Sequence, residues 1–369
     1  MVIALAAQNS WPIFQLDVKS AFLHGDLNKK VFVKQPSGYI KFGQEHKVYK
    51  LKKALYGLKQ APRAWYSRIE AYFLKEGFQK CPYEYTLFVK VENNGKLLLV
   101  CLYVDDFLFT GNDHTIFDEF KKSMMAEFDM SDLGRMHYFM GIEVIQSDAG
   151  IFISQKKYVR EILRRFQMEN CNPVCTPAET SLKLVRDKNG RKVDSTLYKQ
   201  IVGSLMYLTI TRPNIMYVVS LICRYMENLK EMNLQAAKRI FRYLQGTSDY
   251  GILYKKGEKS DLIGFTNSDY TGDQDDRKST SSYVFKLWSG VISWSSRKQP
   301  IVTLSTTEAE LVGASACVCQ AIWLRKLLEA VHFKQTGLSS TVTIVRPLSY
   351  QKILFYMGEA NILMFVITS

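Results

Sequence analysis

Two short stretches decide how this chain is interpreted: Leu16-Asp17-Val18-Lys19-Ser20-Ala21-Phe22 and Tyr103-Val104-Asp105-Asp106. Asp17 lies at the end of a strand-like segment, and Asp105 and Asp106 lie between two apolar runs that indicate buried strands. Burying neighbouring carboxylates without partners is very costly. A tight turn that exposes both, or a metal ion between them, removes that cost.

Converging carboxylates of this kind suit the transfer of a nucleotide by two metal ions. One cation activates the attacking hydroxyl group, and the other holds the phosphates of the nucleotide. Mg²⁺ prefers oxygen ligands from one or two carboxylates and from phosphates. Neighbours on a strand point to opposite faces, so we expect Asp105 to bind metal most directly and Asp106 to contribute less. The alternative is a polar hairpin tip with Asp17 as a local cap, which the two motifs together make weaker.

Three motifs in this order resemble those of copia-type reverse transcriptases, from the Pol polyproteins of LTR retrotransposons. Residues 103–106 are similar to the signature hairpin, residues 16–23 to the first carboxylate motif, and residues 55–66 to the motif that positions template and nucleotide. The similarity continues through residues 138–143 and 154–158, and it extends to about residue 330.

This resemblance implies RNA-directed DNA synthesis. Asp17, Asp105 and Asp106 would hold two Mg²⁺ ions, and the partners would be an RNA template, a DNA primer and deoxynucleotides. The alternative function is a catalytically inactive retrotransposon remnant that at most binds nucleic acid. The chain starts just before Asp17, where the family has a fingers region, so we expect a truncated protein with part of its nucleotide grip missing.

The resemblance also implies roles for residues that would otherwise pass as ordinary. Phe22 occupies the place of the aromatic residue that excludes a ribose 2′-hydroxyl, although on sequence alone it is more simply a core aromatic. Gly57 and Gln60 would lie against nucleotide and template, although alone they indicate a turn. Arg63 belongs to the same template- and nucleotide-binding set.

A basic stretch without acidic residues runs between Glu45 and Glu70. Its basic residues alternate with aromatic ones, which suits a template–primer groove because cations bind phosphate and rings stack on bases. A solvated basic surface is the alternative. The residues are Lys47, Lys50, Lys52, Lys53, Lys59, Arg63 and Arg68, with Tyr49, Tyr56, Trp65 and Tyr66.

Residues of about 260–345 resemble the ribonuclease H domain that follows copia-type reverse transcriptases. The first catalytic Asp of that family falls at Asn267, whose neutral amide ligates a hard cation weakly. Glu310 matches the second carboxylate, and Asp269 is two residues from the first position. From about Ile344 the chain no longer resembles the family, and we interpret this ending as a shifted reading frame. We predict that ribonuclease H activity is lost.

The fold class that follows is α+β: a reverse-transcriptase palm with a helical thumb or connection, followed by an α/β ribonuclease H-like domain. The expected domains are 1–155 for the palm with its fingers largely missing, 156–255 for the helical thumb or connection, 256–345 for the degenerate ribonuclease H-like domain, and 346–369 for an aberrant tail.

Local patterns predict several individual elements. Asn94-Gly95 predicts a hairpin between residues 86–91 and 97–104. Ser154 is expected to cap a helix that carries Tyr158, Ile162 and Phe166, and Gly246 is expected to end another. Two helical stripes are expected, one through Ile116, Phe120, Met124 and Phe128 and one through Leu234, Ala237, Phe241 and Leu244. Lys238, Arg239 and Arg242 lie off the second stripe, and we expect them to face water, with a phosphate backbone as the alternative. Strands are expected at 262–265, 283–287 and 291–294, and a helix at 306–330.

Composition is consistent with a nucleic-acid partner and an intracellular chain. The 369 residues carry a net charge of +14, which favours a polyanion, with nucleic acid ahead of a membrane. Seven irregularly spaced cysteines do not form a disulfide framework, and we interpret them as packing residues in a reducing compartment. No targeting signal or membrane span is visible, so we expect a cytoplasmic location without membrane contact.

Overall fold

The computed structural model describes most of the chain, and it divides into two compact units. The motif unit consists of Trp11–Met136 and Lys326–Phe333, and the second unit consists of Met1–Ser10, His137–Arg325 and Lys334–Ser369. The described residues are 1–179, 184–185, 193–227, 229–257 and 262–332, with the backbone alone of 341–345, 352–357 and 362–367. The expected tail, 346–369, lies outside the described residues apart from two of these backbone strands.

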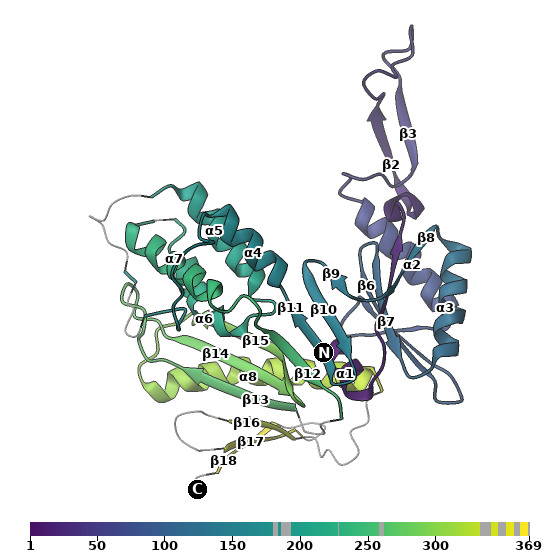
Figure 1. Ribbon diagram of the computed structural model, residues 1–369. Coiled ribbons are helices and arrows are strands. Elements are labelled where there is room, and N and C mark those ends of the chain that lie inside the picture. The colour runs from purple at the N-terminus through teal and green to yellow at the C-terminus, as the bar shows by residue number, and fades with distance from the viewer. Residues whose placement is uncertain are drawn as a thin grey trace. The chain divides into compact units, whose positions relative to one another are not determined.

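A six-stranded antiparallel sheet forms the centre of the motif unit, with the order β4-β5-β6-β7-β1-β8. Helices α2 (Ala61–Lys75) and α3 (His114–Glu127) pack against one face of it (Figure 1). The strands are β1 (Phe14–Val18), β4 (Gln79–Lys80), β5 (Leu87–Val91), β6 (Leu97–Tyr103), β7 (Asp106–Gly111) and β8 (Met130–Arg135). The predicted hairpin of β5 and β6 is confirmed, with Gly95 at a φ of 80° in its turn.

Alternation along the strands separates a helix-covered face from a carboxylate face. Leu16 of β1 and Phe107 of β7 are fully buried in the core beneath the helices. Asp17 and Asp106 are the next residues along, so they point to the other face. The predicted stripe of α3 is confirmed, because Ile116, Phe120 and Met124 are buried in that core, and Phe128 follows the helix in the same core.

A separate two-stranded sheet extends from the motif unit as an arm (Figure 1). Its strands are β2 (Asp26–Lys34) and β3 (Val48–Lys53), and the short helix η1 (Ala21–His24) leads into it. No pattern in the sequence predicted these strands.

In the second unit, a sheet of order β12-β11-β10-β9 carries helix α1 (Val2–Asn9) against β11 and β12. The apolar start of the chain is therefore a packed helix, in which Ala4, Leu5, Ala6 and Ala7 are buried. The strands are β9 (Tyr138–Phe139), β10 (Ile142–Ser147), β11 (Gly150–Ser154) and β12 (Gly251–Lys255).

Four helices and one short 3₁₀ segment form the helical part of the second unit. They share one core, in which the predicted Leu234, Ala237, Phe241 and Leu244 are buried. Gly246 is the C-cap of α7, as predicted. The elements are α4 (Lys156–Arg165), α5 (Ser195–Leu208), η2 (Pro213–Ile215), α6 (Met216–Cys223) and α7 (Glu231–Gln245).

One local prediction for these helices is wrong, and another is refined by the structure. Ser154 does not cap α4, because it ends β11 and pairs with Glu143 and Gly251 in the sheet. Instead the carboxylate of Glu143 accepts the backbone N–H of Lys157 at 2.5 Å. On α7, Lys238 is exposed, as expected for a solvated face, while Arg239 and Arg242 are half-buried. Both bind the preceding segment, through contacts of Arg239 with Glu179 and Thr176 and of Arg242 with the carbonyl of Asn172.

The remaining sheet has the order β15-β14-β13-β16-β17-β18. Strand β16 lies parallel to β13, and the other neighbours are antiparallel. The three predicted strands are longer than expected, and the helix predicted at 306–330 has those bounds. The elements are β13 (Leu262–Ser268), β14 (Thr280–Leu287), β15 (Gly290–Lys298), α8 (Thr306–Ala330), β16 (Thr341–Val345), β17 (Lys352–Met357) and β18 (Ile362–Ile367).

Helix α8 is long and apolar enough to cross a membrane by length and composition, the one such helix in the described part of the chain. A core helix passes the same test. Ala309, Cys317, Ala321 and Leu324 are buried at helical spacing, and Gln299 donates to the carbonyl of Ala309 at 2.7 Å. We therefore interpret α8 as a helix packed against its own sheet.

Candidate active site

The hairpin of β6 and β7 presents the paired carboxylates on a strained turn. Tyr103 pairs with Asp106, and Val104 and Asp105 form the two-residue connection. Val104 has a φ of 56°, a left-handed conformation that is costly for a β-branched residue. Such strain persists only where the surroundings impose it.

A buried tryptophan imposes that turn. The indole N–H of Trp65, on α2, donates to the backbone carbonyl of Val104 at 2.5 Å. Trp65 is only 1% exposed. A hydrogen bond from the buried side of the turn therefore holds it in place. The same bond links the motif of residues 55–66 directly to the carboxylate hairpin. Sequence reasoning assigned Trp65 to stacking on nucleic acid, which its burial contradicts.

Asp17 lies directly opposite Asp106 in the pairing of β1 with β7. Asp105 is half-buried in the turn, and its backbone carbonyl accepts the N–H of Val18 at 2.9 Å. Burial raises the pKa of Asp17 above its usual range, and the negative charges of Asp106 and Asp105 raise it further, against the opposing effect of Lys19. The three predicted carboxylates therefore lie within electrostatic reach of one another.

Sequence reasoning missed Gln15, a neighbour of this group. The side-chain amide of Gln15 donates to Oδ1 of Asp106 at 2.9 Å, and the residue is only 7% exposed. The hydrogen bond fixes one oxygen of that carboxylate and leaves the other for a further partner. The available signal was strand alternation, which puts Gln15 on the same face as Asp17; its partner, 91 residues away, could not be read from the sequence.

The donor set suits a hard divalent cation, because it consists of carboxylate oxygens that repel one another. Within the described residues, however, no group of three or more His, Cys, Asp or Glu side chains is arranged to hold a metal ion. The carboxylates are thus neighbours that have not converged. Whether Asp105 contributes more than Asp106 stays a prediction.

Replacement of Asp17 by Asn should stabilise the metal-free chain at neutral pH. A carboxyl group whose pKa is raised by folding contributes stability only in acid, and this contribution is lost as the pH rises through the folded-state value. At pH 7 the charge opposes folding, so the Asn variant should melt at a higher temperature than the wild type. Thermal melts without Mg²⁺ would measure this, with Asp118→Asn, an exposed carboxylate of α3, as control. An unchanged or lower melting temperature would contradict the repulsion.

The residues predicted to position nucleotide and template lie on η1 and around the start of α2. The ring of Phe22 packs against Tyr56, with ring centroids 4.6 Å apart. Gly57 adopts a φ of 90°, which explains glycine at this turn. Gln60 is the N-cap of α2, and Arg63 is exposed in its first turn. Their roles toward nucleotide and template stay predictions, to which the structure adds Tyr56 as a contact of Phe22.

Some residues of the predicted basic and aromatic groove make contacts within the protein instead. Besides Trp65, the hydroxyl of Tyr66 donates to the carbonyl of Tyr85 at 2.6 Å. Arg68 forms an ion pair with Glu127. These residues belong to α2, one side of which packs against the core. The sequence alone does not show which side of the helix is buried. Tyr49 and Tyr56 remain 44% and 49% exposed, so both can contact a ligand.

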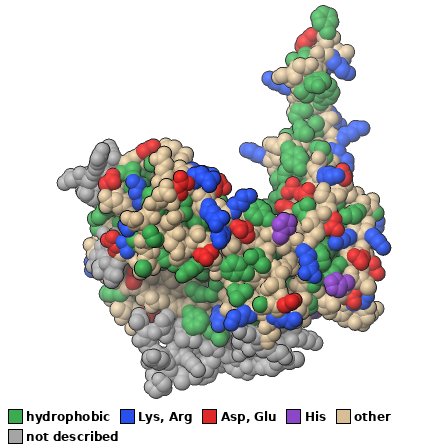
Figure 2. Space-filling model, in the orientation of Figure 1, with side chains coloured by type: hydrophobic (Ala, Val, Ile, Leu, Met, Phe, Trp, Pro, Cys, Tyr) green, Lys and Arg blue, Asp and Glu red, His purple; other side chains and the backbone are tan. Residues whose placement is uncertain are grey.

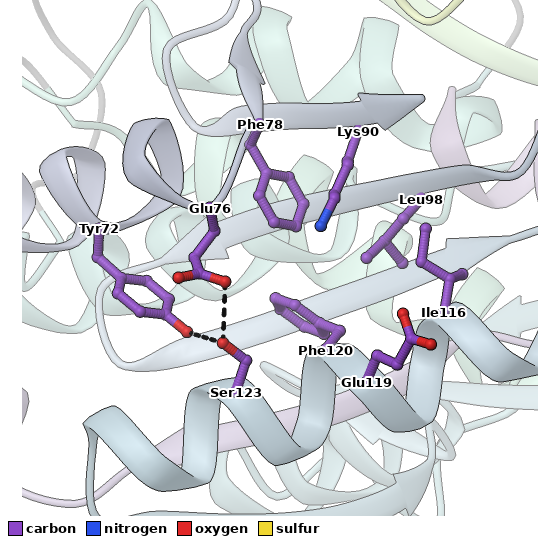
Figure 3. A pocket seen from close by; sticks show the side chains of 9 residues that line it. All are labelled: Tyr72, Glu76, Phe78, Lys90, Leu98, Ile116, Glu119, Phe120 and Ser123. Atoms are coloured by element: carbon purple, nitrogen blue, oxygen red, sulfur yellow. Dashed lines mark hydrogen bonds between the residues drawn. The ribbon is translucent and has the colours of Figure 1, made fainter. Parts of the chain in front are cut away.

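A cavity of about 220 Å³ lies on the helix-covered side of the same sheet. In Figure 3 the hydroxyl of Tyr72 and the carboxylate of Glu76 both point at Ser123 of α3, and Phe120 and Leu98 close the cavity. Leu98 and Phe120 belong to the core on this side. The cavity is therefore separated by the sheet from the face that carries Asp17 and Asp106.

The second predicted site is not assembled as a metal site. Asn267 is exposed on β13, and Glu310 is half-buried near the start of α8. Asp269 turns toward the following loop, where its carboxylate accepts the N–H of Thr280 at 2.5 Å, and burial raises its pKa. None of the three belongs to a metal-binding group among the described residues.

A buried carboxylate that sequence reasoning missed holds this loop. Asp273 is 5% exposed and forms ion pairs with Lys298 at 2.6 Å and Arg224 at 3.4 Å. Burial raises its pKa, but the hydrogen bonds from Lys298 and from the backbone of Asp275 and Asp276, with the charge of Lys298, together outweigh this, so the pKa of Asp273 lies below its usual range. The loop is thereby tied to α6 and β15, a structural role.

Comparisons with known proteins agree with the motifs. Residues 1–180 match the family described as reverse transcriptase (RNA-dependent DNA polymerase). The chain is 41% identical over 336 residues, 91% of its length, to the retrovirus-related Pol polyprotein from transposon RE1 of Arabidopsis thaliana. It is 37% identical over 343 residues, 90% of its length, to that from transposon TNT 1-94 of Nicotiana tabacum.

Shorter relatives also match. The chain is 30% identical over 308 residues, 83% of its length, to a putative transposon Ty5-1 protein of Saccharomyces cerevisiae, and it covers 100% of that protein. It spans 23% of the Arabidopsis polyprotein and 26% of the tobacco one, about a quarter of each.

Proposed function

This chain belongs to the copia-type reverse transcriptase family of retrotransposon Pol polyproteins, and on that premise we propose that it synthesises DNA on an RNA template. The substrates would be deoxynucleotides and a DNA primer. The observation that carries the proposal is the register of β1 and β7, which sets Asp17 opposite Asp106 beside the turn that holds Asp105.

Asp17, Asp105 and Asp106 would hold two Mg²⁺ ions. When bound, these ions would lower the pKa of the primer 3′-hydroxyl and neutralise charge on the nucleotide phosphates. The role of the protein itself is to position these carboxylates. Trp65 supports the turn through the Val104 carbonyl, and Gln15 fixes one oxygen of Asp106. The raised pKa of Asp17 supports the proposal, because repelling carboxylates gain most from a bound cation.

Gly57, Gln60 and Arg63 would contact nucleotide and template at the start of α2, where all three are exposed. The test of the whole proposal is extension of a DNA primer by the purified chain with Mg²⁺, on matched RNA and DNA templates. Extension on the RNA template is expected. If the chain binds the RNA template and primer but does not extend the primer, the alternative of an inactive remnant is favoured. The observation that supports this alternative is that the carboxylates have not converged in the described structure.

Phe22 would exclude ribonucleotides by meeting their 2′-hydroxyl. Replacement by Ala should raise incorporation of a ribonucleotide relative to the matching deoxynucleotide by at least about 10-fold, because the ring that fills this space is gone. Single-nucleotide incorporation measures the ratio. Tyr56→Phe keeps the ring beside Phe22 and serves as control. An unchanged ratio in Phe22→Ala would contradict the gate.

Residues of about 256–345 would be a ribonuclease H-like domain without activity. Three antiparallel strands, a helix and a strand parallel to β13 support the fold. Asn267 and the inward-turned Asp269 support the loss of metal binding. The chain should leave the RNA strand of a labelled RNA–DNA hybrid intact with Mg²⁺, under conditions in which an authentic ribonuclease H cleaves it. Cleavage that copurifies with the chain would contradict this.

A further inference from the structure

Most side chains of the arm of β2 and β3 are exposed, although α2 contacts β2 and η1 contacts β3. Its pairing places Phe32 opposite Lys50 and Lys34 opposite Val48. All four are exposed; Phe32 and Val48 are 57% and 52% exposed. A two-stranded hairpin is only marginally stable alone in water, and large exposed apolar side chains mark interaction surfaces. The arm therefore has the character of a surface that acts with a partner.

Charge points to the class of that partner. Residues 26–53 contain eight lysines and two acidic residues, an excess of six positive charges. The two acids are already engaged inside the arm, because Asp26 pairs with Lys53 at 3.2 Å and Glu45 accepts the N–H of Gly43 at 2.8 Å. Figure 2 shows basic and hydrophobic side chains interspersed along the arm. A polyanion with apolar faces complements this surface.

The tip of the arm is an ordered loop. The side-chain amide of Gln35 donates to the carbonyls of Gln44 and Lys47 at 2.7 and 3.1 Å, and its oxygen accepts the N–H of Lys41 at 3.0 Å. A cavity of about 130 Å³ opens there. Amides, two ammonium groups and one ring meet in its lining, which is formed by Gln35, Lys41, Gln44, Lys47, Val48 and Tyr49.

Two further aromatic side chains of the same loop are highly exposed. Phe42 is 100% exposed and Tyr39 is 78% exposed. Lysines for phosphate together with rings on which bases stack are the features of single-strand binding surfaces. A duplex would offer its phosphates but not its base faces, so the rings favour a single strand.

We propose that the tip of the arm, residues 35–49, binds single-stranded nucleic acid at a site separate from the carboxylates. The proposal rests on the proposed function for the identity of the strand, the unpaired part of the template. Lys41 and Lys47 contact phosphates, and Tyr39, Phe42 and Tyr49 stack on bases. Strand β2 has nine residues and spans roughly 30 Å, so this site lies well away from the base of the arm.

Binding of a labelled single-stranded RNA to the full chain tests this charge contact. Lys41→Glu/Lys47→Glu should lower the affinity at low salt by at least about 10-fold and should reduce the slope of log affinity against log salt by about 1.4, since each phosphate contact contributes about 0.7. Lys75→Glu/Lys122→Glu is the matched control, because it makes the same charge change at exposed helix positions of the same unit.

Replacement of a ring separates stacking from charge. Phe42→Leu keeps an apolar side chain but cannot stack, and it should weaken binding several-fold, whereas Phe42→Trp should retain it. The inference is overturned if the control charge reversal lowers the affinity as much as the tip charge reversal does. It is also overturned if none of the tip variants changes the affinity. A change of oligomeric state in the tip variants without a change of affinity overturns it too, because a second copy of the chain would then be the occupant.

Primer extension keeps this inference distinct from the proposed function. If the wild type does not extend a primer but binds RNA through the tip, the inference stands and the polymerase proposal fails. If it extends primers and the tip variants bind RNA as the wild type does, the polymerase proposal stands and the inference fails.

Discussion

Asp105→Asn/Asp106→Asn should abolish DNA synthesis while template–primer binding persists. The two substitutions remove two of the three carboxylates that would hold the metal ions and leave neutral amides of almost the same size. Metal ions contribute several kcal/mol to stabilising the transition state, so we expect incorporation to fall on the order of 10³-fold. Single-turnover incorporation of one deoxynucleotide on an RNA template measures the loss.

The carboxylate hairpin makes this variant informative. Asp105 in the turn and Asp106 at the start of β7 are both half-buried, and neither belongs to the core beneath the helices, so the substitutions do not disturb that core. Asp118→Asn, on the exposed side of α3, is the matched control and should remain active. If the double variant synthesised DNA at the wild-type rate, either a contaminating polymerase would be present or residues other than these carboxylates would bind the metal ions.

Trp65→Phe should slow incorporation by roughly 10- to 100-fold with little change in template–primer affinity. Phe fills most of the buried space but lacks the indole N–H, so the carbonyl of Val104 loses its 2.5 Å hydrogen bond. This hydrogen bond is part-buried, and the loss of a typical hydrogen bond costs about 0.5–1.5 kcal/mol. The strained turn then relaxes, and a shift of about 1 Å in a catalytic group can cost roughly 10²-fold in rate.

A matched variant separates this effect from a general weakening of α2. Tyr72→Phe also removes one hydrogen bond of α2, the contact with Ser123 at 2.5 Å, on the side of the cavity rather than of the turn. It should lower stability without a comparable loss of rate. Trp65→Ala should cost roughly 3–5 kcal/mol of stability through the cavity left behind. If Trp65→Phe and Tyr72→Phe slow incorporation equally, Trp65 has no special role at the turn.

The parts of the fold that the sequence predicted are those set by local pattern. The stripe of α3, the β5–β6 hairpin and the bounds of α8 follow from helical spacing, a turn dipeptide and apolar content. The candidate carboxylates followed from motif order, and the register of β1 and β7 then brought Asp17 opposite Asp106.

The errors arose where long-range packing decides. A tryptophan among basic residues suits nucleic-acid stacking, but only the tertiary fold determines that Trp65 faces the core. The partner of Gln15 is 91 residues away, and the partners of Arg239 are at least 60 residues away. Strands β2 and β3 were also missed, because their lysines interrupt the apolar alternation by which strands are recognised.

We propose that Asp17, Asp105 and Asp106 converge on two metal ions when substrate is present. Anomalous diffraction from Mn²⁺, in crystals of the chain with an RNA template, a DNA primer and a deoxynucleotide, would locate the ions directly. We expect two Mn²⁺ ions between these carboxylates and the nucleotide phosphates, a few ångströms apart. Ions bound elsewhere, or a bound nucleotide with no metal at the three carboxylates, would contradict it.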